Sequence, residues 1–241
     1  MTRRQILPGT IFTLALVTTC AAQFDFKKLQ SSATAAVANG GLSKESLLEG
    51  KAALNTQLDT AATGLAKPGA VAVAPPESVA KLSLALAKTP QGAAAASAFG
   101  STLSAAASKA APEAMALVRE TISKFTLQDA IAISAGSTKD AATAYLRRAA
   151  EPRLRTDLGK VMAKTTAAVG VPDKYKAMLA LAGPLAASYG VPAVGDFDGY
   201  LAGKTLDTVF GAMAKSEMAL RENPALSSNA LVQQFYGAAK K

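Results

Sequence analysis

Small side chains constrain the fold of this chain more than any other feature of its sequence. Residues 91–111 are almost all small, and their large apolar anchors are Phe99 and Leu103. Half of the chain is hydrophobic, yet only 5% is aromatic and there is no Trp. Alanine-rich segments favour helices, and small side chains allow those helices to pack closely. We therefore predict an all-α fold, with residues 91–111 in a central helix rather than inserted in a membrane.

Apolar residues recur at helical spacing along most of residues 43–241. This pattern predicts eight or nine helices with short connections, which form a single compact multi-helix domain. Pro112 is expected to start a new helix, and Pro152 to lie early in another. The proline-bounded segment at residues 71–76 is read either as a short strand or as a loop packed on the domain.

The N-terminus has the pattern of a secretory signal peptide. Arg3 and Arg4 precede an apolar stretch at residues 11–17 that is too short to span a bilayer, and small residues follow it. We predict a signal peptide at residues 1–22 and a flexible arm at residues 23–42. The mature chain is expected to be exported to the periplasm and to contain no transmembrane helix.

The sequence leaves the processing of this leader open. Cleavage after Ala22 would release a free chain, whereas the Val17–Cys20 segment resembles a lipobox that would make Cys20 a lipidation site and anchor the protein to the envelope. The adjacent arginines fit a twin-arginine leader as well as an ordinary one.

Composition excludes several classes of chemistry. The chain has no His, which removes Ser-His and Cys-His catalytic pairs and the commonest metal ligand. Its one cysteine, Cys20, lies in the leader, so the mature chain has no disulfide and no thiolate metal site. Asp196 and Asp198 lack the further oxygen ligands of a calcium loop and are read as helix-capping residues. We expect no metal and no cofactor.

One arginine-rich segment is the candidate binding site. Its residues all lie within one predicted helix or just before it, and they are Asp140, Tyr145, Arg147, Arg148, Arg153 and Arg155. Arginine binds phosphate and carboxylate groups well. The alternative is a solvated helix face on which Arg147 or Arg148 pairs with nearby carboxylates. Nucleic acid is an unlikely partner, because Tyr145 is the only aromatic residue available to stack on a base.

An ordered series of short motifs resembles the bacterial family called domain of unknown function 4197. The motifs are Pro75–Glu77, Ala111–Ala114, Phe125–Ala130, Asp140–Arg148, Asp173–Lys176, Asp198–Tyr200, Lys204–Phe210 and Arg221–Ala225. They run from about residue 43 to residue 237. The resemblance implies an exported, helical, envelope-associated protein, and it supplies no activity or catalytic residue.

The chain departs from the family pattern at two places. Ser104 and Ser108 stand where an Asn and a Glu are expected, and residues 227–229 replace an expected Arg-Thr-Thr run. These departures argue against an intact enzyme.

Three functional hypotheses remain open from the sequence. The leading one is a non-enzymatic envelope protein with a binding or structural role. The second is a His-independent hydrolase or transferase that uses Asp140, Tyr145, Arg147 and Arg148. The third draws on the net charge of +9, and it is a basic adaptor for anionic membranes or cell-wall polymers that uses Arg147, Arg148, Arg153 and Arg155.

Overall fold

The computed structural model describes residues 44–134, 136, 138–191 and 197–238. Within these ranges the chain is helical and contains no strand, which confirms the all-α prediction. The helices are α2 (Lys44–Leu65), α3 (Glu77–Leu86), α4 (Pro90–Ser123), α5 (Leu127–Ser134), α6 (Ala141–Val169), α7 (Val171–Ala182), α8 (Leu185–Ser188), α9 (Phe197–Glu222), the 3-10 helix η1 (Pro224–Leu226) and α10 (Ala230–Ala238). The predicted signal peptide, arm and lipidation residue Cys20 lie outside the described residues and stay predictions.

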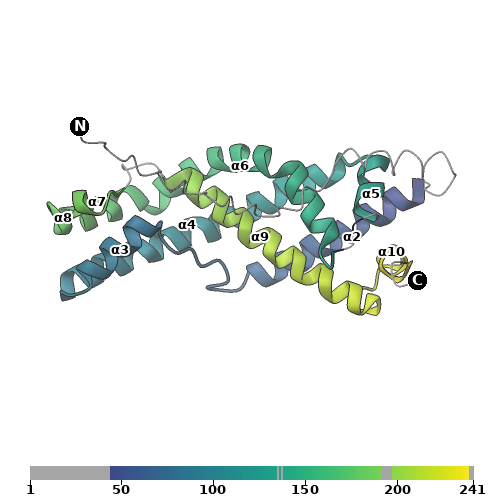
Figure 1. The fold of residues 1–241 in the computed structure, drawn as a ribbon, viewed down its shortest axis with the longest axis horizontal. Coiled ribbons are helices and arrows are strands. Elements are labelled where there is room, and N and C mark those ends of the chain that lie inside the picture. The colour runs from purple at the N-terminus through teal and green to yellow at the C-terminus, as the bar shows by residue number, and fades with distance from the viewer. Residues whose placement is uncertain (1–43, 135, 137, 192–196, 239–241) are drawn as a thin grey trace, which may run out of the picture.

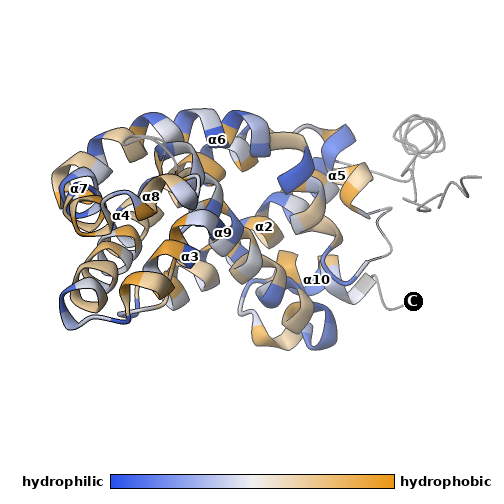
Figure 2. Ribbon diagram, turned by 60° about the vertical axis from the view of Figure 1, so that its left-hand side comes forward, coloured by the Kyte–Doolittle hydropathy of each residue, from blue (hydrophilic) through white to orange (hydrophobic). Residues whose placement is uncertain are grey.

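Four long helices form the body of an elongated molecule (Figure 1). α4, α6 and α9 pack against one another, and α2 packs on α9 and α4. α3 and α7 lie beside α4 at one end, together with α8, and Figure 2 turns this end toward the viewer. α5 and α10 pack on α2 at the other end. The two ends therefore differ in the helices that form them.

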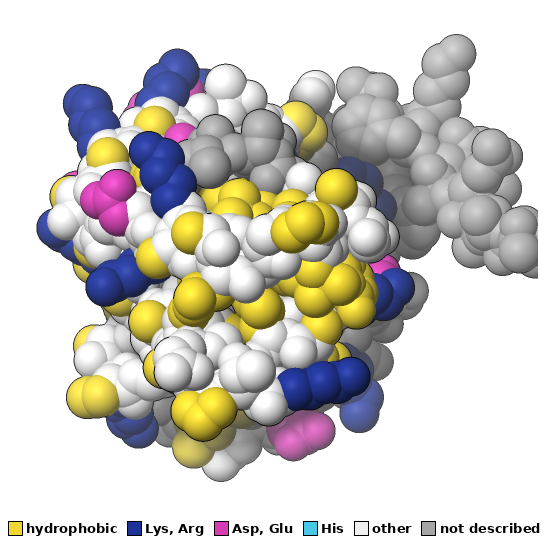
Figure 3. Space-filling model, turned by 90° about the vertical axis from the view of Figure 1, so that its left-hand side faces the viewer, with side chains coloured by type: hydrophobic (Ala, Val, Ile, Leu, Met, Phe, Trp, Pro, Cys, Tyr) yellow, Lys and Arg dark blue, Asp and Glu magenta, His cyan; other side chains and the backbone are white. Residues whose placement is uncertain are grey.

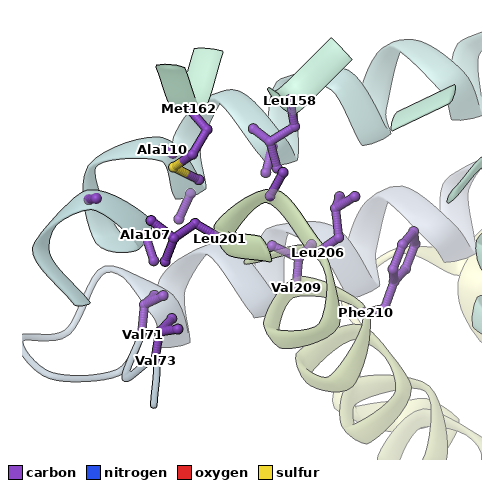
Figure 4. Close-up of a cluster of buried hydrophobic side chains, with 14 of the residues drawn as sticks. Val71, Val73, Ala107, Ala110, Leu158, Met162, Leu201, Leu206, Val209 and Phe210 are labelled. Atoms are coloured by element: carbon purple, nitrogen blue, oxygen red, sulfur yellow. The ribbon is translucent and has the colours of Figure 1, made fainter. Parts of the chain in front are cut away.

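Alanines on α4 allow α6 and α9 to approach its backbone closely. Their exposure is at most 3% at Ala106, Ala107, Ala110, Ala111 and Ala114. Figure 4 shows the larger side chains that fill the space around them, which are Leu158 and Met162 of α6 and Leu201, Leu206, Val209 and Phe210 of α9. The small residues seen in the sequence thus form the centre of the core, and their neighbours supply most of its volume.

Three aromatic rings join α4, α7 and α9. The ring of Phe99 lies 5.2 Å from that of Tyr175 and 5.2 Å from that of Phe197, and the last two are 4.8 Å apart, measured between centroids. All three side chains are buried. Tilted and edge-on aromatic pairs of this kind stabilise a core beyond the area that they bury.

The segment at residues 71–76 is a loop packed on the domain, not a strand. Val71 and Val73 are buried, and hydrogen bonds attach the backbone of the segment to α4 and to α9. Val73 N donates to Ser104 Oγ of α4 at 3.1 Å, and the Tyr200 hydroxyl of α9 donates to the carbonyl of Ala74 at 2.7 Å. These bonds satisfy backbone groups that a strand would pair with a neighbouring strand.

The prediction that Pro112 starts a helix is wrong, while Pro152 lies in a helix as expected but well after its start at Ala141. Pro112 lies inside α4 and Pro152 lies inside α6. Each proline removes one helical hydrogen bond, to the carbonyl four residues earlier. Both prolines are exposed, and so are Ser108 and Arg148 four residues before them. Water can therefore bind the released carbonyls, which is why the two helices continue.

Side chains cap two of the helices. Thr126 N donates to Asp129 Oδ2 at 2.6 Å, and Asp129 N donates back to Thr126 Oγ1 at 3.4 Å, which is the reciprocal pattern of a capping box. Asn223 Oδ1 accepts from Ala225 N at 3.2 Å, and Pro224 follows it at the start of a short 3-10 helix.

Candidate functional site

The predicted arginine-rich site is divided between two sides of α6. Arg147 pairs with Glu151 at 2.8 Å and with Asp207 of α9, and its guanidinium lies 5.7 Å from the centroid of the Phe210 ring. Arg155 reaches Glu151 at 3.4 Å and lies against Gly203 of α9. These two arginines therefore help to join α6 to α9.

Carboxylates hold Arg147 in a fixed position. Its hydrogen bond to Glu151 is the main cause that lowers the pKa of the Glu151 carboxyl below its usual value. The paired geometry was one of the two interpretations of this segment from the sequence, and the structure contains it for Arg147.

Tyr145 points to a different partner. Its hydroxyl donates to Asp129 Oδ1 of α5 at 2.5 Å. Burial, followed by this hydrogen bond, raises the pKa of the Tyr145 phenol well above its usual range. A phenol with such a pKa keeps its proton and fixes α5 against α6, since its hydrogen bond bridges the two helices.

The remaining members of the predicted site are more exposed. Arg153 pairs with Asp157 at 3.6 Å on the side of α6 away from Arg147. Arg148 is exposed. Asp140 occupies the N-cap position of α6, but its side chain does not cap the helix. The structure therefore does not gather the six residues around one cavity, and their binding role stays a prediction.

A buried carboxylate on α9 caps α6 in place of Asp140. Glu217 is 0% exposed and accepts hydrogen bonds from the backbone N–H groups of Ala142 at 3.0 Å and Thr143 at 2.8 Å. Arg221 donates to the same carboxylate through Nε at 2.9 Å and Nη2 at 2.7 Å. The sequence indicated the helical spacing of Glu217 and Arg221, but it gave no sign that Glu217 reaches another helix.

This carboxylate belongs to a polar cluster that joins four helices. The Thr143 hydroxyl lies 2.8 Å from Glu217 Oε2 and 3.1 Å from Gln57 Oε1 of α2, and Gln57 Nε2 donates to the Tyr236 hydroxyl of α10. Gln57 and Tyr236 are fully buried. Its members bond one another across α2, α6, α9 and α10, so we assign the cluster a structural role in fixing these four helices.

A groove between α4 and α6 has the composition of an anion-binding site. Its volume is about 410 Å³, and it is lined by Lys109 and Glu113 of α4 and by Lys160, Val161, Lys164 and Thr165 of α6. We call this surface the lysine groove. Lys160 pairs with Asp157 at 3.1 Å. Within the described part of the chain, Lys109 and Lys164 form no ion pair.

Helical spacing extends the lysine groove along α6. Arg153, Asp157, Lys160 and Lys164 follow at intervals of four, three and four residues and so share one face. Arg153 is thus the member of the predicted arginine set nearest to the groove along this face. The sequence showed Lys160 and Lys164 beyond the arginines, but Lys109 comes from another helix and could not be assigned to the groove.

A second groove lies beside the 71–76 segment, with a volume of about 590 Å³. Its walls are neutral and consist of small residues of α4 and of Gly69, Val71, Ala72 and Val73. Ser104 and Ser108, the two departures from the family pattern, line this groove and bond the segment, with Ser108 Oγ 3.4 Å from the carbonyl of Val71. We find here no charged group to hold a ligand.

The described residues contain no group of three or more Asp and Glu side chains that could hold a metal ion. Asp198 lies in the first turn of α9, where it accepts a hydrogen bond from Thr166 Oγ1 at 2.7 Å. Asp196 lies outside the described residues.

The geometry defines a class of protein, namely an elongated helical protein in which a buried polar cluster around Glu217 connects four helices. The chain belongs to the family described as Protein of unknown function (DUF4197), whose model matches residues 32–237. This confirms the resemblance inferred from the motifs. No match was found among curated proteins or among solved structures.

Proposed function

We propose that this chain is a non-catalytic, exported protein of the cell envelope that binds anionic groups in the lysine groove. The observation that carries the proposal is the position of Lys109 and Lys164, which face one concave surface from two helices without an ion-pair partner in the described residues. Phosphate or carboxylate groups that repeat along a polymer fit the chemistry of such a surface.

The cost of this arrangement supports a ligand. Lys160 and Lys164 are four residues apart on α6, and like charges at this spacing destabilise a helix by about 0.2–0.5 kcal/mol. Lys109 adds a third positive charge from α4, and Glu113 and Asp157 compensate only part of the total. A bound anion would remove this repulsion.

The arrangement of the predicted catalytic residues gives less support to a hydrolase or transferase. That alternative requires Asp140, Tyr145, Arg147 and Arg148 to act on one substrate. Tyr145 and Arg147 instead bind carboxylates of α5, α6 and α9. These contacts give Tyr145 and Arg147 a role in stability that requires no catalytic function.

Titration with inorganic polyphosphate tests the proposed site. The variant K109Q/K164Q removes two groove charges, and the control K139Q/K215Q removes two exposed charges elsewhere. We expect the groove variant to bind about tenfold more weakly at low salt and with a shallower salt dependence, because fewer counterions are released. The control should bind within about twofold of the unchanged protein. Equal losses in the two variants would assign the binding to net charge and reject the site.

The intact mass of the protein, purified separately from the soluble periplasm and from the membrane fraction, tests export. A chain that begins at Gln23 in the soluble fraction, or at a lipid-modified Cys20 in the membrane fraction, supports an envelope protein. An unprocessed chain in the cytoplasm would contradict that part of the proposal.

A further inference from the structure

Two uncharged stretches of the chain meet at one end of the molecule. Two long segments without a charged residue, 89–108 and 177–191, form the first half of α4, the second half of α7 and all of α8. α4 and α7 pack together, so the two segments meet at this end. Figure 3 views this end and shows hydrophobic side chains spread across it, with Lys and Arg side chains mostly nearer its margin.

Three leucines project from this end. Leu84 of α3, Leu181 of α7 and Leu185 of α8 are 74%, 52% and 42% exposed. Ser83 Oγ lies 3.8 Å from Met178 Sδ, which places α3 directly beside α7. Leucines exposed to this degree on neighbouring elements form an apolar surface that water solvates poorly.

Positive side chains flank these leucines in the sequence. Lys88 follows α3, and Lys174 and Lys176 lie on α7, all three exposed. Asp173 is the one acidic residue of α7, and Glu77 of α3 is paired with Lys81 at 2.6 Å. The flank therefore carries an excess of positive charge, which attracts anionic head groups and repels a second copy of the same surface.

We propose that this end docks on the surface of a membrane that contains anionic lipids. Leu84, Leu181 and Leu185 would enter the boundary between head groups and acyl chains, while Lys88, Lys174 and Lys176 contact the head groups. No helix in the described ranges is long and apolar enough to cross a membrane. Peripheral contact is the mode of binding that remains open to these leucines.

The size of the apolar surface favours a membrane over a second protein chain. The three leucines together expose less than the surface of two whole leucine residues. A stable protein interface takes roughly 20–30 residues from each partner. Insertion of a few side chains into lipid needs no such area, because the bilayer adapts to their shape.

Sedimentation with lipid vesicles tests the proposal on protein purified from cells. The vesicles contain phosphatidylcholine alone or with one third phosphatidylglycerol. The variant L181S/L185S removes two of the leucines, and the control L48S/L226S removes leucines that are 48% and 64% exposed on α2 and η1. Because all four positions are exposed, circular dichroism should show that both variants keep the fold.

We expect binding to the anionic vesicles that weakens about tenfold or more in L181S/L185S, from the lost burial of two apolar side chains. The control L48S/L226S should bind like the unchanged protein, and L181S/L185S should keep its affinity for inorganic polyphosphate, which separates this surface from the lysine groove. Absence of binding to anionic vesicles, or binding that L181S/L185S leaves unchanged, would overturn the proposal. Self-association that disappears in L181S/L185S without vesicle binding would assign the surface to a second copy instead.

Discussion

Glu217 shows how one residue can fix the arrangement of several helices. Its carboxylate is fully buried, yet two backbone N–H groups, one hydroxyl and the Arg221 guanidinium surround it. The first turn of a helix leaves its N–H groups without intrahelical partners, and a negative charge there is favourable. The carboxylate therefore stabilises α6 from a position on α9.

Replacing Glu217 with Gln should lower the free energy of unfolding by about 2–3 kcal/mol, because Arg221 loses its buried counter-charge and the new amide presents N–H groups to donors. Urea denaturation measures the change. Asp59→Asn is the matched control, since it also removes an ion pair, with Arg119 at 2.6 Å, but an exposed one. The control should change stability by less than about 1 kcal/mol. Similar losses in both variants would contradict the role assigned to Glu217.

Glu151 makes stability depend on pH. Its carboxyl pKa is lowered from 4.5 chiefly by the hydrogen bond from Arg147. The stability from this pairing is therefore present above the unfolded-state pKa and is lost as the pH falls through the folded-state pKa. Urea midpoints measured from about pH 5 down to pH 3 should fall less steeply in Glu151→Gln than in the unchanged protein. Glu113→Gln, which removes a carboxylate outside any ion pair in the described residues, is the control. A slope unchanged by Glu151→Gln would argue against the pairing.

The sequence indicated a partner for the Glu151 carboxylate but not the partners of the Glu217 carboxylate on α6. Arg147 and Glu151 lie four residues apart on one helix, so their pair was among the pairings that spacing allowed. Glu217 acts on residues about 75 positions away. Nothing local in the sequence indicates that contact, because it depends on how α9 packs across the start of α6. The lysine groove could not be predicted from the sequence for the same reason, since Lys109 lies on a different helix from Lys160 and Lys164.

The lengths of the helices in this protein depend more on their buried faces than on prolines in the sequence. Pro112 was expected to start a helix and Pro152 to lie early in one, and each is tolerated well inside a helix because its position faces solvent. The alanine face of α4 is continuous across Pro112, from Ala106 to Ala114, so packing against α6 and α9 favours a single helix. Periodicity predicted the helical class, whereas the lengths of α4 and α6 followed from tertiary contacts.

Two glycines of α4 should respond in opposite ways to alanine. A Cβ on Gly92 would lie 2.2 Å from the backbone carbonyl oxygen of Leu86, whereas nothing lies within 4 Å of a Cβ on Gly100. Gly92→Ala should destabilise the protein by about 1–3 kcal/mol, because the turn between α3 and α4 must shift. Gly100→Ala should stabilise it by about 0.5–1 kcal/mol through helix propensity. Thermal denaturation of both variants checks this. A loss of stability in Gly100→Ala would contradict the open space found around a Cβ at Gly100, on the α4 surface beside the 71–76 segment.

An apolar surface and a charged surface lie at different places along the molecule. The end that contains α3, α7 and α8 carries long uncharged segments and exposed leucines. The lysine groove lies between α4 and α6, and most arginines and carboxylates of α6 form ion pairs beside it or toward α9. The sequence showed the net charge of +9 and the uncharged segments, but their placement required the fold.

Lysine footprinting tests the proposed anion site most directly. The protein is acetylated briefly with and without inorganic polyphosphate, and mass spectrometry reports the modification of each lysine. The account predicts protection at Lys109, Lys160 and Lys164, with little change at Lys139 and Lys215. Protection spread evenly over the exposed lysines, or concentrated away from the groove, would contradict it.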